Sequence, residues 1–319
     1  MPRYSIIVPV YNRPQEVDEL LASLTSQTFT DFEVLIIEDG STIPCDKVFE
    51  LYTHQLAIRY FFKPNSGPGP SRNFGYQQAR GEYFIVFDSD CIVPPNYLES
   101  VEKFLRKTPL DAWGGPDRGH EDFTTLQRAM AFTMSSVITT GGIRGGAKKL
   151  TDYQPRSFNM GITRKVFQQT GGFKFDRFAE DIEFSIRMAK GGYTVGYIPD
   201  AFVYHKRRTN LKQFYKQVYN FGRGRVMVSR KHPEAVKLTH WFPTIFSSGM
   251  VIIILLLPFH WTLGATLAGL YVTYFFTVII LAYLSLRSIP VAIVAGPAAF
   301  IQLVGYGYGF LKEKLKGSR

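Results

Sequence analysis

The sequence has 319 residues, a net charge of +11, 45% hydrophobic and 15% aromatic residues, and two cysteines. This apolar content is ample for a packed core and excludes a chain that is too polar to fold. The length fits one large domain or one domain with an appendage. The cysteines lack the spacing of a metal site and indicate a reducing compartment. Because a strand pattern follows the first residues directly, we expect no signal peptide.

Strand and helix patterns alternate through residues 1–90. Apolar runs that end in turn residues predict strands within 4–12, 32–42, 58–64 and 83–90. Helices are expected between them, over 13–28, over 47–53 and after the Gly/Pro-rich start of 66–81. This alternation predicts a parallel, doubly wound α/β sheet, in which ligands bind at the carboxyl ends of the strands.

Polar residues follow three of these predicted strands. Tyr11 and Asn12 follow the first, Asp39 ends the second, and Asp88 and Asp90 end the fourth. Like charges this close repel, and one carboxylate tends to stay protonated unless a cation compensates the pair. The two aspartates therefore indicate a divalent cation, although a strand that simply ends in a turn would carry the same residues.

The loop of sequence NSGPGPSRNFG, which includes Arg72, opens the helix before the fourth strand. Its backbone N–H groups, the helix N-terminus and the guanidinium suit a phosphate. Asp39 can accept hydrogen bonds from a base or a ribose, and a cation on Asp88 and Asp90 would bridge a diphosphate. No G-x-G-x-x-G follows the first strand, which counts against a dinucleotide. The pattern indicates a nucleoside diphosphate compound bound together with a metal.

Later segments add candidates to this site. Glu180 and Asp181 stand at the entry of a predicted helix, where acidic residues either stabilise the helix dipole or take part in proton transfer. His205 ends a predicted strand and is a structural residue or a metal ligand. The Gly-rich, basic segment 139–150 is either a mobile loop over the bound nucleotide compound or a plain surface loop.

The last third of the chain is apolar and follows a basic block. Ten Lys or Arg residues and one acidic residue lie in 206–240, a charge that would also suit nucleic acid. Three uncharged runs follow, at 242–259, 263–286 and 289–310, and they fit membrane helices far better than soluble core helices. The basic block is then interpreted as a cytoplasmic flank that faces lipid, so we expect membrane lipids and no nucleic acid as partners.

The charges leave the number of membrane crossings open. Three full spans that start in the cytoplasm would place the basic tail 312–319 outside, against the positive-inside tendency. The first run is the shortest and contains Pro243 and Pro258, so one segment can be re-entrant or interfacial. We expect two or three helices to anchor the chain in the cell (inner) membrane, with the catalytic domain on the cytoplasmic side, rather than a soluble apolar helical domain.

Several motifs together resemble the family 2 glycosyltransferases of the GT-A fold. The segments SIIVPVYNRP, EDGS, GPGPSRNFG, FDSD and AEDIEFSIRMAKGGY fall in the order and spacing of that family, over roughly residues 4–225. The resemblance implies a GT-A, Rossmann-like mixed sheet and a metal-dependent, inverting transfer. The donor would be a nucleotide sugar, with uridine favoured as the base. The acceptor would be a hydroxyl of a membrane-associated glycan or lipid-linked molecule in cell-surface glycan or glycolipid synthesis.

The same resemblance assigns roles to individual residues. The Asp of the E-D pair, here Asp181, would be the catalytic base, and Glu180 would orient the acceptor. Mg²⁺ or Mn²⁺ is expected on Asp90, Asp88 and His205. We expect Trp113, with the two glycines after it, to border the sugar or acceptor pocket. The segment FYKQVYNFGRGR loosely resembles a Q-x-x-R-W element without its Trp, and its arginines would reach the diphosphate or lipid phosphates. The residues expected to bind the nucleotide sugar are Pro9, Tyr11, Asp39, Arg72, Asp88, Ser89, Asp90, Arg223 and Arg225.

We therefore expect a GT-A catalytic domain over 1–230, a basic interfacial linker over 231–243, a membrane region of two or three helices over 244–311 and a basic tail over 312–319. A nucleotidyltransferase would want a basic, Gly-rich signature directly after the first strand, and a non-catalytic membrane scaffold would be expected to have lost Asp90 or Asp181. A processive polysaccharide synthase is a closer alternative, but about three helices are too few for a channel. The sequence does not predict the donor sugar, the acceptor, the linkage or the oligomeric state.

Overall fold

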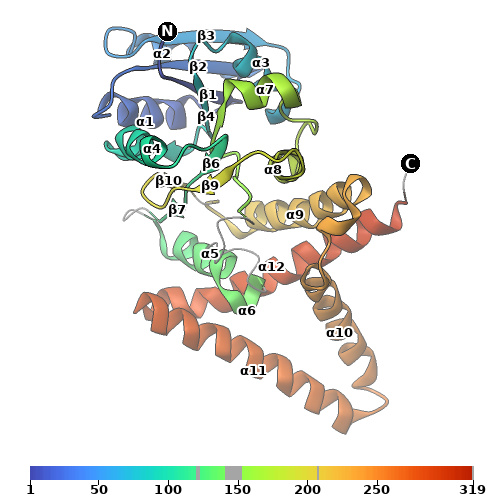
Figure 1. The fold of residues 1–319 in the computed structure, drawn as a ribbon. Helices are drawn as coiled ribbons and strands as arrows, with labels where there is room; N and C mark the ends of the chain where they lie inside the picture. The colour runs from blue at the N-terminus through green and yellow to red at the C-terminus, as the bar shows by residue number, and fades with distance from the viewer. Residues whose placement is uncertain (120–122, 141–152, 207, 318–319) are drawn as a thin grey trace. The chain divides into compact units, whose positions relative to one another are not determined.

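The computed structural model describes residues 1–119, 123–140, 153–206 and 208–317. The chain folds into two compact units (Figure 1). The first comprises 1–120 and 147–206 and contains the sheets, and the second comprises 121–146 and 207–319 and is helical. Most of the Gly-rich segment 139–150, for which we expected a mobile loop or a surface loop, lies outside the described residues.

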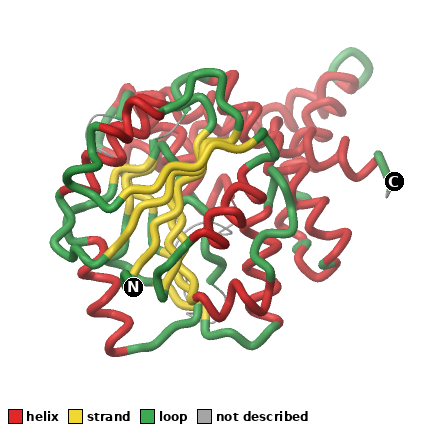
Figure 2. Tube along the Cα trace, turned by 90° about the horizontal axis from the view of Figure 1, so that it is seen from above, coloured by secondary structure: helices red, strands yellow, loops and turns green. Residues whose placement is uncertain are grey.

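The first unit is built on a seven-stranded mixed sheet with the order β3-β2-β1-β4-β8-β6-β9. Figure 2 shows the strands side by side with helices around them. Its first four strands run parallel, as predicted. Strand β8 pairs antiparallel with both β4 and β6, and β9 returns parallel to β6. The expectation of a mixed α/β sheet is thus confirmed. The strands are β1 (Tyr4–Val10), β2 (Phe32–Asp39), β3 (Ile58–Lys63), β4 (Tyr83–Phe87), β6 (Ala112–Gly114), β8 (Asn159–Thr163) and β9 (Val195–Tyr197).

A second sheet of three short strands lies beyond the end of β4, with the order β5-β10-β7. It consists of β5 (Cys91–Ile92), β7 (Asp117–Arg118) and β10 (Val203–His205). Strand β10 pairs antiparallel with β5, and His205 is the register partner of Cys91. This pairing brings a histidine from more than a hundred residues away next to the two aspartates that follow β4.

Helices pack on both faces of the large sheet and form two hydrophobic clusters. Helix α1 illustrates the cause, because its buried residues Val17, Leu20, Leu21 and Leu24 recur at helical spacing. Each such side chain contributes about 1.5–3 kcal/mol when it is buried. The helix expected over 47–53 is shorter and ends at Glu50. The helices of this unit are α1 (Pro14–Thr25), α2 (Asp46–Glu50), α3 (Pro68–Gln78), α4 (Tyr97–Lys107), α7 (Arg164–Thr170) and α8 (Glu180–Lys190).

Trp113 is a core residue of the first unit. Its side chain is fully buried, and its indole lies against Gly161, where an added Cβ would come within 2.1 Å of the ring. The expectation that Trp113 borders the sugar or acceptor pocket is therefore wrong. The glycine on the neighbouring strand makes room for the indole, so this aromatic residue fills the core.

The second unit contains the three apolar segments as helices. Helices α11 and α12 are long and apolar enough to cross a membrane, with mean hydropathy of 2.0 and 1.7. Helix α10 is apolar as well, but its 15 residues are fewer than a crossing helix needs. The charged helix α9 precedes them and belongs to this unit, while the domain boundary expected at 230 stays a prediction. The helices are α5 (Thr125–Ser135), α6 (Val137–Thr140), α9 (Leu211–Lys231), α10 (Phe242–Leu256), α11 (Trp261–Leu286) and α12 (Ile289–Leu315).

Candidate active site

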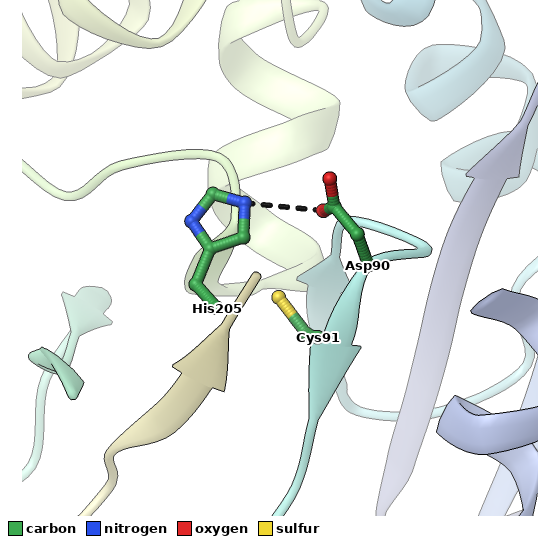
Figure 3. A group of neighbouring side chains, drawn as sticks. All are labelled: Asp90, Cys91 and His205. Atoms are coloured by element: carbon green, nitrogen blue, oxygen red, sulfur yellow. Dashed lines mark hydrogen bonds and ion pairs between the residues drawn. The ribbon is translucent and has the colours of Figure 1, made fainter. Parts of the chain in front are cut away.

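Asp90 and His205 face one another where β4 ends. The Nε2 atom of His205 lies 3.1 Å from Oδ1 of Asp90, and Arg13 donates from Nη1 to Oδ2 of Asp90 at 2.8 Å. Figure 3 shows these side chains converging: Asp90 from the turn before β5, Cys91 from β5 and His205 from the end of β10. One possible ligand atom from each of the three lies within 4.8 Å of the others.

The chemistry of these side chains fits a divalent cation. Carboxylates are the ligands that Mg²⁺ and Mn²⁺ prefer, and an imidazole is a ligand of transition metals, so Asp90 and His205 together fit Mn²⁺ better than Mg²⁺. Burial raises the pKa of the Cys91 thiol well above its ordinary value, which keeps it protonated, and its Sγ donates to the carbonyl of Phe158 at 3.5 Å. The ring of Phe158 stacks on His205, with centroids 4.9 Å apart, and fixes the plane of the imidazole.

Asp88 has a different partner from Asp90. Arg72, on α3, is 3% exposed and donates from Nη2 to Oδ1 of Asp88 and from Nη1 to Oε1 of Glu180, both at 2.7 Å. One guanidinium therefore joins the first aspartate of the D-x-D to the first residue of the E-D pair. The two aspartates are tolerated close together because each has its own cationic partner: Arg72 for Asp88 and Arg13 for Asp90.

The acidic pair enters the site at the start of α8. Ala179 adopts a left-handed conformation (φ 56°), which turns the chain into the helix. Burial raises the pKa of Glu180 to about 7, against the opposing charge of Arg72, and the neighbouring Asp181 adds to the rise. Asp181 is less buried, and its Oδ1 accepts from the backbone N–H of Ile182 at 2.8 Å. Its other oxygen, Oδ2, lies 3.8 Å from Nη1 of Arg156 and faces a partly open environment.

Asp39 lies at the end of β2 and is held by three donors. Its Oδ1 accepts from Lys63 Nζ and from the backbone N–H of Ser66, and its Oδ2 accepts from the N–H of Gly67 at 2.9 Å. Burial alone would raise the pKa of this carboxyl, but these hydrogen bonds outweigh it and hold the pKa below its ordinary value. Asp39 is therefore an ionised acceptor at neutral pH. The φ of 98° at Gly67 lets the loop turn its N–H groups toward the carboxylate.

The end of β1 is tied to the end of β2 by a network that includes Asn12. This residue has a φ of 54°, and its Oδ1 accepts from the backbone N–H groups of Thr42 and Ile43 at 2.8 and 2.9 Å. Its own N–H donates to Oγ of Ser41 at 2.7 Å. The network fixes the backbone beside Tyr11, whose side chain is 51% exposed, so its ring is free to contact a ligand.

The remaining predicted residues divide between the two units. Pro9 is half-buried near the end of β1, and Ser89 is buried between the two aspartates. Arg223 and Arg225 lie on α9 in the helical unit, where Arg223 donates to Oε2 of Glu313 at 3.0 Å. Their assignment to the diphosphate therefore stays a prediction.

The sequence interpretation missed three cationic residues: Arg13, Lys63 and Arg156. Arg13 and Lys63 stand within three residues of the ends of β1 and β3, so the rule that selected Tyr11 and Asp39 would have found them. Arg156 gave no such signal, because only the folded chain brings it near Asp181.

Comparisons with known proteins point to one family. The model of the family described as glycosyl transferase family 2 matches residues 5–171, more than half of the chain. An uncharacterized glycosyltransferase of Rickettsia felis is 38% identical over 105 residues, which cover 33% of this chain and 17% of that protein. The poly(ribitol-phosphate) beta-N-acetylglucosaminyltransferase TarS of Staphylococcus aureus is 37% identical over 109 residues, which cover 33% of this chain and 19% of that protein. The matched part thus spans less than a fifth of these relatives' length.

A solved structure has the same fold over nearly the whole chain. The mannosyltransferase PcManGT from Pyrobaculum calidifontis, solved in complex with GDP-Man and Mn²⁺, superposes with a TM-score of 0.68. The superposition covers 99% of this chain and 88% of that one, at 17% sequence identity. At this identity the likeness establishes the fold of the chain alone, and it confirms the expected GT-A fold.

Proposed function

The chain belongs to glycosyl transferase family 2, and from this membership we propose that it transfers a sugar, with inversion, from a nucleotide sugar to a hydroxyl of a membrane-associated acceptor. The observation that carries the proposal is the family match together with the group of acidic residues at one edge of the sheet. Asp39, Asp90 and Asp181 stand there with separate partners, so each is available for a separate task. A processive polysaccharide synthase remains the alternative within the same family.

The donor side of the site is formed by the ends of β1 and β2 and the start of α3. Asp39 is ionised and accepts N–H groups, so it suits the N–H or hydroxyl donors of a base or ribose, with Pro9 and Tyr11 beside it. Ser89 and the loop before Arg72 follow the same edge and suit the phosphates. We propose a uridine nucleotide as the donor. The nucleotide sugars named for TarS and PcManGT, UDP-GlcNAc and GDP-Man, support the class of donor.

A bound Mg²⁺ or Mn²⁺ would supply positive charge against the leaving diphosphate. Asp90 and His205 would hold it, and Asp88, which Arg72 already neutralises, would bind more weakly. Arg13 fixes the carboxylate of Asp90 from its other oxygen. Buried Arg72 holds Asp88 and Glu180 in place, so we assign it a positioning role in addition to contact with the donor.

The acceptor side is formed by the start of α8. Oδ2 of Asp181 takes the proton of the acceptor hydroxyl while the acceptor oxygen bonds to the anomeric carbon. The bond from that carbon to the diphosphate breaks in the same step, and its electron pair leaves with the diphosphate. Glu180, held by Arg72, orients the acceptor. A base on one face and a leaving group on the other give inversion.

The helical unit is proposed to attach the enzyme to the inner membrane, with the sheet unit on the cytoplasmic side. Large apolar side chains are exposed along α10 and α11, where a soluble protein would bury them. The basic residues before α10 would face anionic lipid. A membrane-bound acceptor would then be presented to the enzyme at the surface where it is anchored.

The test is a donor panel. Purified full-length protein in detergent is incubated with UDP-, GDP-, CMP- and dTDP-sugars and Mn²⁺, and the released nucleotide is measured with membrane extract as the acceptor source. We expect release from one UDP-sugar that depends on the extract. Release from another class of donor would overturn the uridine assignment, and no release from any donor would contradict the transferase proposal.

A further inference from the structure

The contacts within the helical unit decide which apolar helices enter the membrane. We infer that α12, despite its length and hydropathy, does not cross the bilayer, and that α10 and the first half of α11 form the inserted hairpin. The inference rests on the proposed membrane attachment and adds a topology to it. Its consequence is that the basic tail and the catalytic unit lie on the same side of the membrane.

Three helices of this unit, α5, α6 and α9, are held on the catalytic side by chain connectivity. Helices α5 and α6 lie between strands of the sheet unit, since the chain leaves that unit after β7 and re-enters it before β8. An 11-residue helix is about 16 Å long, against about 30 Å of hydrocarbon, so α5 cannot cross and return. Helix α9 begins at Leu211, a few residues after β10 ends at His205.

The first half of α12 packs against α5 and α6. Gln302 donates from Nε2 to the carbonyl of Thr133 at 3.0 Å, and it is buried. Ala129 of α5 lies in one cluster with Ala292, Ala295 and Ala299 of α12. Small residues allow this close contact between the helices. A helix held along this half by α5 cannot leave the side of the membrane on which α5 lies.

The second half of α12 packs against α9. An added Cβ on Gly309 would come within 2.1 Å of the backbone of Tyr219, so the two helices touch there at their backbones. Glu313, which is buried, accepts from Arg223 at 3.0 Å and from Arg230 at 3.1 Å. Arg230 also donates to the carbonyl of Glu313 at 2.9 Å. Charged groups are expensive in hydrocarbon, so this network belongs at or above the membrane surface.

The start of α10 and the middle of α11 are hydrogen-bonded to α12 and α6, the helices that we place on the catalytic side of the membrane. Thr244 donates to the carbonyl of Gly307 on α12 at 3.2 Å, and the hydroxyl of Tyr274 donates to the carbonyl of Ile138 on α6 at 3.1 Å. The second half of α11 therefore lies beside α6 and α12. What remains free is the rest of α10, the turn after it, and residues 261–273 of α11, which are about 20 Å long.

This hairpin carries exposed apolar side chains that a bilayer would cover. Further ones, such as Phe276, Ile280 and Ile293, lie on the second half of α11 and the first half of α12, where they would face the membrane surface. Figure 1 shows α10 and α11 meeting at a turn. The exposed fractions of the side chains around that turn are high: Ile254 65%, Leu255 63%, Phe259 81% and Trp261 70%. Aromatic residues beside apolar ones are typical of segments that enter a membrane. With α12 on the catalytic side, the basic tail 312–319 also obeys the positive-inside tendency.

Cysteine accessibility tests this topology on the full chain. Both natural cysteines, Cys45 and Cys91, are buried, and the parent protein serves as the unlabelled control. Lys212→Cys on α9, Ser285→Cys at the end of α11 and Lys316→Cys after α12 are each labelled with a membrane-impermeant maleimide, in right-side-out and inside-out vesicles. We expect all three to be labelled only in inside-out vesicles, where the cytoplasmic face is exposed.

The alternatives give different patterns. Three full spans would place position 316 on the side opposite to 212, and a hairpin of α11 and α12 would place position 285 opposite to both. Either pattern overturns the inference while leaving the glycosyltransferase proposal intact. Flotation of the vesicles tests attachment separately: protein that stays at the bottom of the gradient would overturn both the attachment and this topology.

Discussion

Each of the two units departs from the usual distribution of polar and apolar residues in a soluble protein, and the two departures are opposite. The sheet unit buries charged groups, among them Asp39, Asp90 and Glu180, whereas the helical unit exposes large apolar side chains. Both arrangements cost free energy unless something compensates for them. In the sheet unit the compensation is already present as arginines, lysine and backbone N–H groups. In the helical unit lipid would supply it under the proposed membrane attachment. The comparison teaches that each unit is adapted to a different partner.

The largest effect should come from the buried carboxylate of Asp90. We expect EDTA to abolish transfer and Mn²⁺ to restore it, and Asp90→Asn to lower kcat/KM by at least about 10²-fold, because it removes a ligand charge. The measurement is nucleotide release with the active donor. Asp31→Asn, an exposed aspartate at the opposite end of β2, is the matched control and should leave activity unchanged. Full activity in excess EDTA would contradict the metal site.

The next effect concerns the guanidinium that joins Asp88 to Glu180. Arg72→Met leaves both carboxylates without their cation, and breaking a buried pair in this way costs about 3–5 kcal/mol of unfolding free energy. Thermal unfolding followed by circular dichroism should show a markedly lower Tm. Arg106→Met removes an exposed arginine from Glu102, which keeps Arg3 and Tyr4 as partners, and should cost about 1 kcal/mol or less. Equal shifts in the two variants would mean that Arg72 does not compensate the carboxylates.

The exposed hairpin of the helical unit gives a prediction in lipid. Ile254→Ser and Leu255→Ser each remove an apolar side chain from the bilayer, at about 1.5–3 kcal/mol per residue, so binding to liposomes should weaken about tenfold or more per substitution. Vesicle sedimentation measures the partition coefficient. Leu51→Ser, at an equally exposed position of the sheet unit, is the control. Unchanged partitioning of the hairpin variants would place the membrane contact elsewhere.

The smallest effect is the pH dependence that Glu180 confers. Its pKa is about 7 in the folded chain and near 4.5 when unfolded, so the folded state binds more protons between these values. The free energy of unfolding should therefore fall as pH rises from about 4.5 to about 7. Glu180→Gln should flatten this slope in Tm measured from pH 5 to pH 7.5. The exposed Glu50→Gln should keep the slope, and an identical slope in the Glu180 variant would disprove the raised pKa.

The sequence predicted the parallel half of the sheet because each of its elements is local. Strands β1 to β4 and helix α1 have apolar patterns that need no distant partner, and the Gly/Pro-rich loop marks the start of α3. Strands β6 and β9 have three residues each, which is too short for such a pattern, and their order in the sheet depends on contacts far apart in sequence. The apolar helices were predicted from composition alone. The packing of α12 was not predicted, because hydropathy does not distinguish contact with lipid from contact with other helices.

Within the site, the acidic residues were predicted and their partners were not. Aspartates at strand ends are visible as a pattern, whereas Arg72 as the link between Asp88 and Glu180 requires the fold, since Glu180 is 108 residues away. Trp113 was misjudged for the same reason. The space for its indole is created by Gly161 on the neighbouring strand, and nothing in the sequence around Trp113 indicates that strand.

Asp181 is the residue on which the proposed chemistry depends most directly. Asp181→Asn keeps the size of the side chain and the oxygen that accepts a hydrogen bond from the N–H of Ile182. The amide cannot take a proton at neutral pH. Isothermal titration with UDP and Mn²⁺ is compared with the transfer rate, and Asp176→Asn, an exposed neighbour, is the control. We predict unchanged nucleotide affinity with kcat and kcat/KM lowered together by about 10²–10⁴-fold. Normal turnover in the Asn variant would contradict the assignment of the base, and loss of nucleotide binding would place Asp181 in the donor site instead.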